Sequence, residues 1–236
     1  LDTPTAGAFR FNTDSSQLEI YDGNQWTGVL ATSPELQTGG GRGIFWGGAP
    51  SANNVIQYIT ISSTGNAIDF GDRTQASNEI DGLSTEIRGV FAGGYVTPTN
   101  RNTMDYITIA STGNAVDYGD LTVARQSPSA AASSTRMVWM GGEGSPANVN
   151  TIDYVTILTT GNATDFGDLT VERSGAAPMQ NSTRGLWGGG YRNDPTATFY
   201  DTIDYVTMAS AGNAVDFGNF AQTQCYGLSG CSPTRG

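Results

Sequence analysis

The chain contains no lysine and no histidine, and all 11 of its basic residues are arginine. Ser-His-Asp and Cys-His catalysis, imidazole-ligated metals, the lysine of a phosphate-binding loop and Schiff-base lysines each need a residue that is missing. The two absences argue against most common enzyme classes. We therefore expect a protein that is not an enzyme and holds no cofactor.

Positive charge and long apolar runs are also scarce. The chain has 22 acidic residues against 11 basic ones, a net charge of −11, which repels nucleic-acid phosphates and anionic membranes. No apolar stretch approaches the roughly 18 residues that a membrane helix needs. We expect no nucleic-acid partner and no membrane insertion. Its 236 residues can form a single all-β domain over 1–236.

What the sequence does contain is an internal repeat. Four segments combine an arginine, a short apolar run and paired glycines, and each is followed by a Tyr-centred alternating run, a Gly-Asn-Ala turn and an Asp-aromatic-Gly unit. The arginines are Arg42, Arg88, Arg136, Arg184 and, opening a fifth unit, Arg235, spaced 46, 48, 48 and 51 residues apart. The repeat units are 42–87, 88–135, 136–183 and 184–234.

All of the length variation lies in one loop per repeat. Between the second glycine and the tyrosine (Tyr58, Tyr106, Tyr154, Tyr205) there are 9, 11, 11 and 14 residues. The aromatic residue of the Asp-aromatic-Gly unit always lies 12 positions after the tyrosine, and the next arginine always lies 18 positions after that aromatic residue. The rest of the unit keeps a fixed length.

Alternation of apolar and polar residues, as in DYITIAS and DYVTILT, predicts strands. In the third repeat we expect four: Gln126 to Ser134, Arg136 to Gly142, Asp153 to Leu158 and Ala163 to Leu169. The repeats contain no long amphipathic helical pattern. Units of this length with four antiparallel strands are typical of β-propeller blades.

Paired glycines closing the second strand, a tyrosine in the third, an aromatic in the fourth and then Leu121 to Arg125 (Leu-x-x-x-Arg) resemble a kelch repeat. The kelch pattern commonly has a tryptophan in its fourth strand, where this chain has Asp-Phe-Gly-Asp or Asp-Tyr-Gly-Asp. The strings TMDYITIASTGNAVDYGDLTVAR and CSPTRG resemble tandem kelch-like repeats in virion structural proteins of marine cyanobacterial phages. Residues 6–29 resemble a short β-segment of phage tail-fibre proteins. The resemblance implies a virion protein that acts outside the host cell.

The two ends of the chain look like parts of one blade. Gly7 to Phe11, Gln17 to Tyr21 and Gln25 to Val29 can supply three strands, and residues 225–236 can supply a first strand. Pairing residues 6–29 with 225–236 would close the ring and cover two sheet edges. We therefore expect a five-bladed kelch-like propeller. The alternative is that both ends are cut from a longer array.

Several repeated side chains have structural and functional interpretations. The repeated acids could form a calcium ring or a catalytic pair, but their recurrence favours turn caps and ion pairs with Arg42, Arg88, Arg136 and Arg184, so we expect no metal site. The tryptophans favour a core role over sugar stacking. Cys225 and Cys231 are too far apart along a strand for a disulfide, and Cys231 fits a core position. The acids are Asp69, Asp72, Asp117, Asp120, Asp165, Asp168 and Asp216, and the tryptophans are Trp46, Trp139 and Trp187.

The variable loops are the best candidates for binding, because propeller topology gathers them on one face and a rigid scaffold commonly presents its binding residues on loops. They are rich in amides, hydroxyls and tyrosines, which suit sugar hydroxyls and ring faces. The expected partner is a host-surface glycan or another virion protein. The alternatives are a carbohydrate-active enzyme using Glu143, Asp194 and Asp201, or an architectural segment without a ligand. The candidate residues are Tyr95, Asn100, Arg101, Asn148, Tyr191, Arg192, Asn193, Asp194 and Tyr200.

Overall fold

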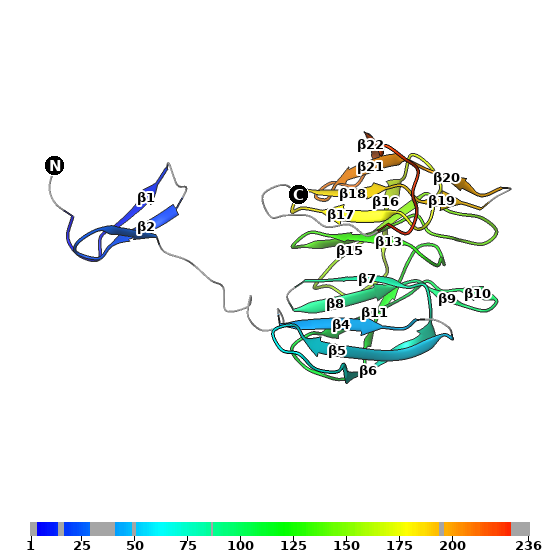
Figure 1. Cartoon of the computed structure of the whole chain (residues 1–236), viewed down its shortest axis with the longest axis horizontal. Helices are drawn as coiled ribbons and strands as arrows, with labels where there is room; N and C mark the ends of the chain where they lie inside the picture. The colour runs from blue at the N-terminus through cyan, green and yellow to red at the C-terminus, as the bar shows by residue number, and fades with distance from the viewer. Residues whose placement is uncertain are drawn as a thin grey trace. The chain divides into compact units, whose positions relative to one another are not determined.

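The computed structural model describes residues 4–13, 17–28, 41–48, 51–85, 87–193 and 196–227. These residues form β-strands, turns and irregular segments (Figure 1). The described part of the chain has no helix that could cross a membrane. The chain divides into two compact units, Leu1–Gln37 and Thr38–Gly236.

The first unit contains one antiparallel sheet of three strands, β1 (Phe9–Asn12), β2 (Gln17–Tyr21) and β3 (Trp26–Gly28). Arg10 of β1 contacts both other strands, since its Nε lies 2.7 Å from a carboxylate oxygen of Glu19 in β2 and its guanidinium lies 4.3 Å from the centre of the Trp26 ring in β3. The strands match the three expected segments to within two residues.

The second unit contains four further antiparallel sheets, one per repeat, in which sequence neighbours pair. The first is β4 (Arg42–Trp46), β5 (Asn53–Thr60) and β6 (Ile68–Ser77). The second is β7 (Asp81–Ser84), β8 (Arg88–Ala92), β11 (Thr103–Thr108) and β12 (Val116–Asp120). The third is β13 (Ser129–Ala132), β14 (Arg136–Met140), β15 (Thr151–Thr156) and β16 (Thr164–Asp168). The fourth is β17 (Ala177–Gln180), β18 (Arg184–Gly188), β21 (Thr202–Thr207) and β22 (Val215–Asn219).

The all-β class is confirmed, as are blade-like antiparallel sheets, which have three strands in the first repeat and four in the other three. The four strands expected in the third repeat are β13 to β16, paired in the expected order. A closed ring is absent from the described residues. The expected closing blade needs residues 228–236, which lie outside them, so that closure and the fifth blade stay predictions.

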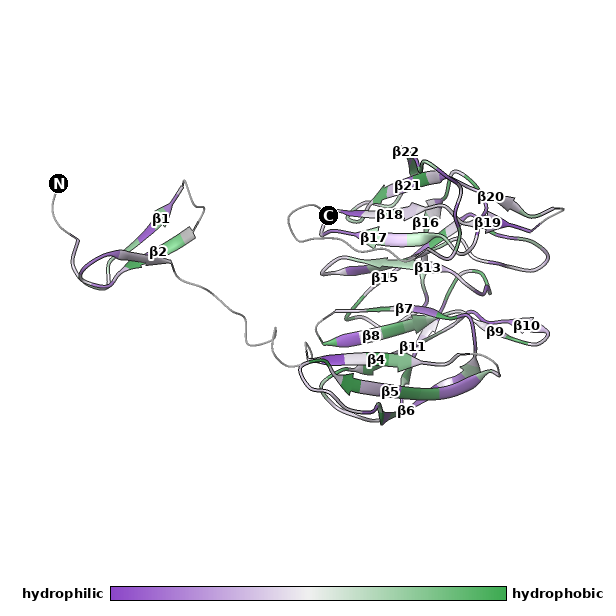
Figure 2. Cartoon of the chain, viewed as in Figure 1, coloured by the Kyte–Doolittle hydropathy of each residue, from purple (hydrophilic) through white to green (hydrophobic). Residues whose placement is uncertain are grey.

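Hydrophobic side chains fill the spaces between adjacent sheets. Trp139 is fully buried among residues of the second and third sheets, and Trp187 is 1% exposed among residues of the third and fourth. Their expected core role is confirmed. Trp46 is half-buried, with its ring centre 4.4 Å from that of Phe91. Strands β4 and β8 run from a hydrophilic start at their arginine to a hydrophobic end (Figure 2).

Three of the four Gly-Asn-Ala turns join their own sheet to the preceding one. Gly161 N and Ala163 N donate to the carbonyls of Tyr118 and Asp120 at 2.7 and 2.8 Å, and Asn162 Oδ1 accepts from Asp120 N at 3.1 Å. We call this set of three bonds the turn contact. It recurs where turn 113–115 meets Phe70 and Asp72, and where turn 212–214 meets Phe166 and Asp168.

A buried ion pair also joins each sheet to the next. The pairs are Arg73–Asp105, Arg125–Asp153 and Arg173–Asp204, each at 2.9 Å with both side chains at most 1% exposed. A threonine hydroxyl (Thr74, Thr122, Thr170) donates to each of these carboxylates. Arg73 lies within β6, whereas Arg125 and Arg173 follow β12 and β16. Each aspartate lies in β11, β15 or β21 of the next sheet.

The ion pairs expected from the sequence are wrong. Among the described residues, none of the arginines that begin a strand (Arg42, Arg88, Arg136 and Arg184) forms an ion pair with a repeated acid. Instead, Arg42, Arg88 and Arg136 lie over tyrosine rings and donate to the Ile109, Ile157 and Met208 carbonyls of the following sheet. Asp117, Asp165 and Asp216 lie within the strands β12, β16 and β22 and not in turns, and their Oδ1 atoms accept from the amide two residues on.

Candidate binding surface

The variable loops gather at one end of the sheets. They include the hairpins β9 (Tyr95–Val96) with β10 (Thr99–Asn100), and β19 (Tyr191–Arg192) with β20 (Thr198–Phe199). Both hairpins project at the same end in Figure 1. In each of the last three repeats the loop pairs with the connection that enters the same sheet: Tyr95 with Asn78, Glu143 with Gln126 and Tyr191 with Ser174. We call residues 78–79, 95–102, 126–127, 143–150, 174–175, 191–193, 196–201 and 226 the loop face.

Side chains connect the loops of neighbouring repeats. Asn100 Nδ2 donates to the Glu143 carbonyl at 2.9 Å. Asn148 Nδ2 donates to Ser174 Oγ at 2.9 Å and to the Tyr191 carbonyl at 3.3 Å, and its Oδ1 accepts from Asn193 N at 3.2 Å. The loop face is therefore continuous from the second to the fourth repeat.

The candidate residues have different environments on this face. Asn148 is 4% exposed with its amide fully engaged, so it positions loops. Arg192 lies 3.5 Å from Glu172 in a partly exposed pair. Asn193 is exposed, and Asp194 lies outside the described residues. Tyr95, Asn100, Arg101, Tyr191 and Tyr200 are half-buried. Their role in ligand contact stays a prediction.

Three aromatic rings and a carboxylate meet on the loop face beside the fourth sheet. The ring centre of Tyr191 lies 5.4 Å from that of Tyr226 and 6.4 Å from that of Phe199. Tyr226 and Phe199 are 62% and 50% exposed. The Tyr226 hydroxyl donates to the Tyr191 hydroxyl at 2.7 Å, and the Tyr191 hydroxyl donates to Glu143 Oε2 at 3.4 Å. We call these four residues the aromatic cluster.

The Tyr226 hydroxyl of the aromatic cluster stays protonated at neutral pH. Burial raises the pKa of Tyr226, and its hydrogen bond to Tyr191 raises that pKa further. The cluster thus presents flat apolar faces, two hydroxyls and one carboxylate side by side. This combination can stack on the C–H face of a sugar ring and exchange hydrogen bonds with its hydroxyls.

Sequence reasoning missed Phe199 and Tyr226. Tyr226 occupies the same repeat position as Glu79, Ser127 and Gly175, and all four have positive φ, between 46° and 62°. Tyr226 N donates to the Gly175 carbonyl at 2.7 Å, just as Ser127 N donates to the Glu79 carbonyl at 2.8 Å. Counting 51 residues from Gly175 would have placed Tyr226 on the loop face.

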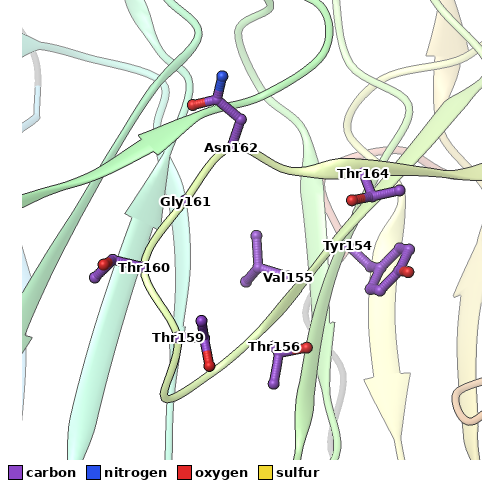
Figure 3. A pocket seen from close by; sticks show the side chains of 8 residues that line it. All are labelled: Tyr154, Val155, Thr156, Thr159, Thr160, Gly161, Asn162 and Thr164. Carbon is purple, nitrogen blue, oxygen red and sulfur yellow. The ribbon is translucent and has the colours of Figure 1, made fainter.

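The opposite end of the sheets carries a hollow of about 240 Å³ inside the β15–β16 turn (Figure 3). Tyr154, Thr160 and Asn162 are among its lining residues. A hollow of about 230 Å³ recurs in the second sheet. Because it repeats with the blade and its asparagines serve the turn contact, it belongs to the scaffold. In the described part of the chain, no group of three His, Cys, Asp or Glu side chains could hold a metal ion.

No protein-family model matches this chain, and no curated protein is similar to it in sequence. These comparisons assign neither a family nor an activity. What the chain itself offers is an array of blade-like sheets with aromatic and acidic groups at one end.

Proposed function

We propose that this chain is a non-enzymatic binding module of a phage virion, a kelch-like propeller that contacts a host-surface glycan through its loop face. The observation that carries the proposal is the aromatic cluster, in which two well-exposed rings lie against Tyr191, whose hydroxyl donates to the Glu143 carboxylate. The virion setting rests on the resemblance of the repeats to phage structural proteins. Another virion protein is the second partner that this resemblance suggests.

The scaffold supports a binding role. The sheets repeat with fixed strand spacing, while the loops that bear Glu143, Tyr191 and Phe199 change length from repeat to repeat. Binding residues are commonly carried on variable loops over a rigid scaffold. The net charge of −11 disfavours phosphate-rich ligands and is compatible with a neutral polysaccharide.

The test measures binding of the full chain to purified host-surface polysaccharide by biolayer interferometry. We expect Phe199→Ser and Tyr226→Ser each to weaken binding at least about tenfold, because each removes an exposed stacking ring. Leu158→Ser is the matched control, since Leu158 is 65% exposed and lies outside the loop face. Unchanged binding in both loop-face variants, with loss on Thr160→Ala at the opposite end, would show that the wrong face was chosen.

A loop exchange tests the same face without removing single rings. Replacing residues 191–201 with residues 49–54 leaves β21 and the buried Asp204 in place, so it should keep the circular dichroism spectrum and weaken binding. The same polysaccharide also tests the enzyme alternative, because hydrolysis produces new reducing ends. We expect none. Cleavage that disappears in Glu143→Gln would overturn the binding-module proposal in favour of a glycosidase.

A further inference from the structure

The first and fourth sheets of the second unit each leave a face uncovered that is buried in the other sheets. Phe45 is 55% exposed, whereas the equivalent side chains Phe91, Trp139 and Trp187 are at most 1% exposed. Phe217 is 54% exposed, whereas the equivalent Phe70, Tyr118 and Phe166 are at most 3% exposed. We call the Phe45 side, with Gln57, Ile61 and turn 65–67, the leading face. The Phe217 side, with Arg184, Gly218 and Gln224, is the trailing face.

These two faces hold the two halves of the turn contact. Gly65 N and Ala67 N correspond to the donors Gly212 N and Ala214 N, and have no hydrogen-bond acceptor among the described residues. The Phe217 and Asn219 carbonyls correspond to the acceptors of Phe166 and Asp168. The leading face therefore offers donors, and the trailing face offers acceptors in the matching order.

Arginine contacts follow the same division. Arg42, Arg88 and Arg136 each donate to a carbonyl of the following sheet, whereas Arg184 is exposed with no such acceptor among the described residues. The corresponding carbonyl belongs to Ile61 on the leading face. Ile61 is 66% exposed, although its equivalents Ile109, Ile157 and Met208 are at most 4% exposed.

The buried ion-pair position supplies an independent match. Gln224 stands where Arg125 and Arg173 stand, and Gln57 stands where Asp105, Asp153 and Asp204 stand. Ala221 replaces the threonine that holds each aspartate. On both end faces, a neutral glutamine therefore stands where the sheets inside the array have a charged residue of the ion pair. Joining an end face to an internal sheet would leave a buried charge unpaired, at a large cost in free energy, whereas joining the two end faces would leave none.

The sheet of the first unit cannot supply the missing half of the turn contact. Its strands β2 and β3 are joined by the four residues 22–25, and it has no Gly-Asn-Ala turn. In the repeats the aromatic residue lies 12 positions after the tyrosine, whereas Trp26 lies five positions after Tyr21. The donors that match the trailing face are those of turn 65–67.

We propose that the trailing face of one copy of this chain docks on the leading face of a second copy, continuing the contact that already joins the sheets within each chain. A head-to-tail contact of this kind either closes a ring or grows a fibre. Two chains with four repeat sheets each would close a ring of eight blades, within the range of natural propellers. The assembly is therefore a closed dimer.

The first test measures the mass of the full chain by sedimentation and light scattering across a concentration series. We expect twice the 24.7 kDa chain mass. Phe45→Asp and Phe217→Asp should each weaken dimerisation at least about tenfold, because a carboxylate would be buried in the contact. Leu158→Asp is the control, since its side chain is equally exposed away from both end faces. Melting temperatures measured under dilute conditions confirm that the variants fold.

Mixing the two variants separates a head-to-tail contact from a symmetric one. Phe45→Asp keeps an intact trailing face and Phe217→Asp keeps an intact leading face, so the mixture should form a heterodimer through one intact contact. A symmetric contact would not be restored by mixing. A chain that stays monomeric at every concentration, dimers that both aspartate variants leave intact, or open fibres would overturn the closed dimer.

Discussion

The guanidinium of Arg173 lies 2.9 Å from the carboxylate of Asp204, and neither side chain has any exposed surface. Arg173 also donates to the Trp187 and Thr202 carbonyls, while Thr170 donates to Asp204. The connection that leaves the third sheet is therefore fixed to β18 and β21 of the fourth by a network whose charges are paired.

Breaking this pair should strongly destabilise the fold. Arg173→Leu leaves a buried carboxylate without its counter-charge, and we expect a loss of about 3–5 kcal/mol in the free energy of unfolding, measured by urea denaturation. Arg192→Leu is the control. It breaks a pair at 3.5 Å whose side chains are 36% and 42% exposed, and should change stability by about 0.5 kcal/mol or less. Equal effects would mean that the buried pair does not hold the sheets together.

Adding a methyl group at Gly119 tests the turn contact. A Cβ there would collide with the Gly161 carbonyl of the next sheet, whereas a Cβ at Gly218 would meet nothing within 4 Å. Both glycines have nearly the same φ, 139° and 140°, so backbone strain is matched. We expect Gly119→Ala to cost about 1–3 kcal/mol more than Gly218→Ala, from melting temperatures in dilute solution. Similar losses of stability in the two variants would show that Gly119 is needed for its backbone conformation alone and not for the turn contact.

Asp81 should make stability depend on pH. Burial raises its pKa from 3.8 to about 6, opposed by hydrogen bonds from the Gly82 and Ala130 amides. The folded state therefore binds the proton more tightly than the unfolded state. The stability that Asp81 contributes is fully present below about pH 4 and is lost as pH rises through about 6.

The pH measurement compares Asp81→Asn with the unchanged chain. Asparagine does not titrate, so the stability of the variant relative to the unchanged chain should increase by about 1–3 kcal/mol between pH 4 and pH 7. Urea denaturation at both values measures this change. Taking the difference cancels the titration of the other carboxyl groups. A constant difference would show that Asp81 has an ordinary pKa.

The strands and their order within each sheet could be predicted, because apolar alternation and turn residues are local signals. Contacts between sheets could not. The sequence shows each Gly-Asn-Ala segment only as a turn, and nothing local reveals that Asn162 caps the amide of Asp120 in another sheet. That contact depends on which sheets face each other.

The error over the ion pairs has a similar cause. Two sets of arginines recur once per repeat, and spacing alone does not distinguish the buried set from the set that lies over tyrosines. The pattern is further hidden in the first repeat, where Arg73 lies three residues after the aromatic residue, while Arg125 and Arg173 lie seven residues after it. Ser77 occupies the usual arginine position there and accepts a hydrogen bond from Arg73 at 2.6 Å.

The candidate surface was predicted in its location and only partly in its residues. The variable loops do lie together at one end of the sheets, but Asn148 holds loops together, and Tyr226 enters from a different connection. Burial and loop-to-loop bonding decide which polar residues remain available to a ligand. Neither can be derived from composition.

Each repeat carries both a Gly-Asn-Ala donor and a fourth-strand acceptor, and every turn contact joins only adjacent sheets. Duplication or deletion of a whole repeat in the gene would therefore leave every remaining junction chemically intact, because the sheets on either side still meet through the same backbone atoms. Array length can change by recombination between repeats without new side chains being selected. The repeats that bear Gln57 and Gln224 are the exception, since moving either into the interior would place an amide opposite a charge.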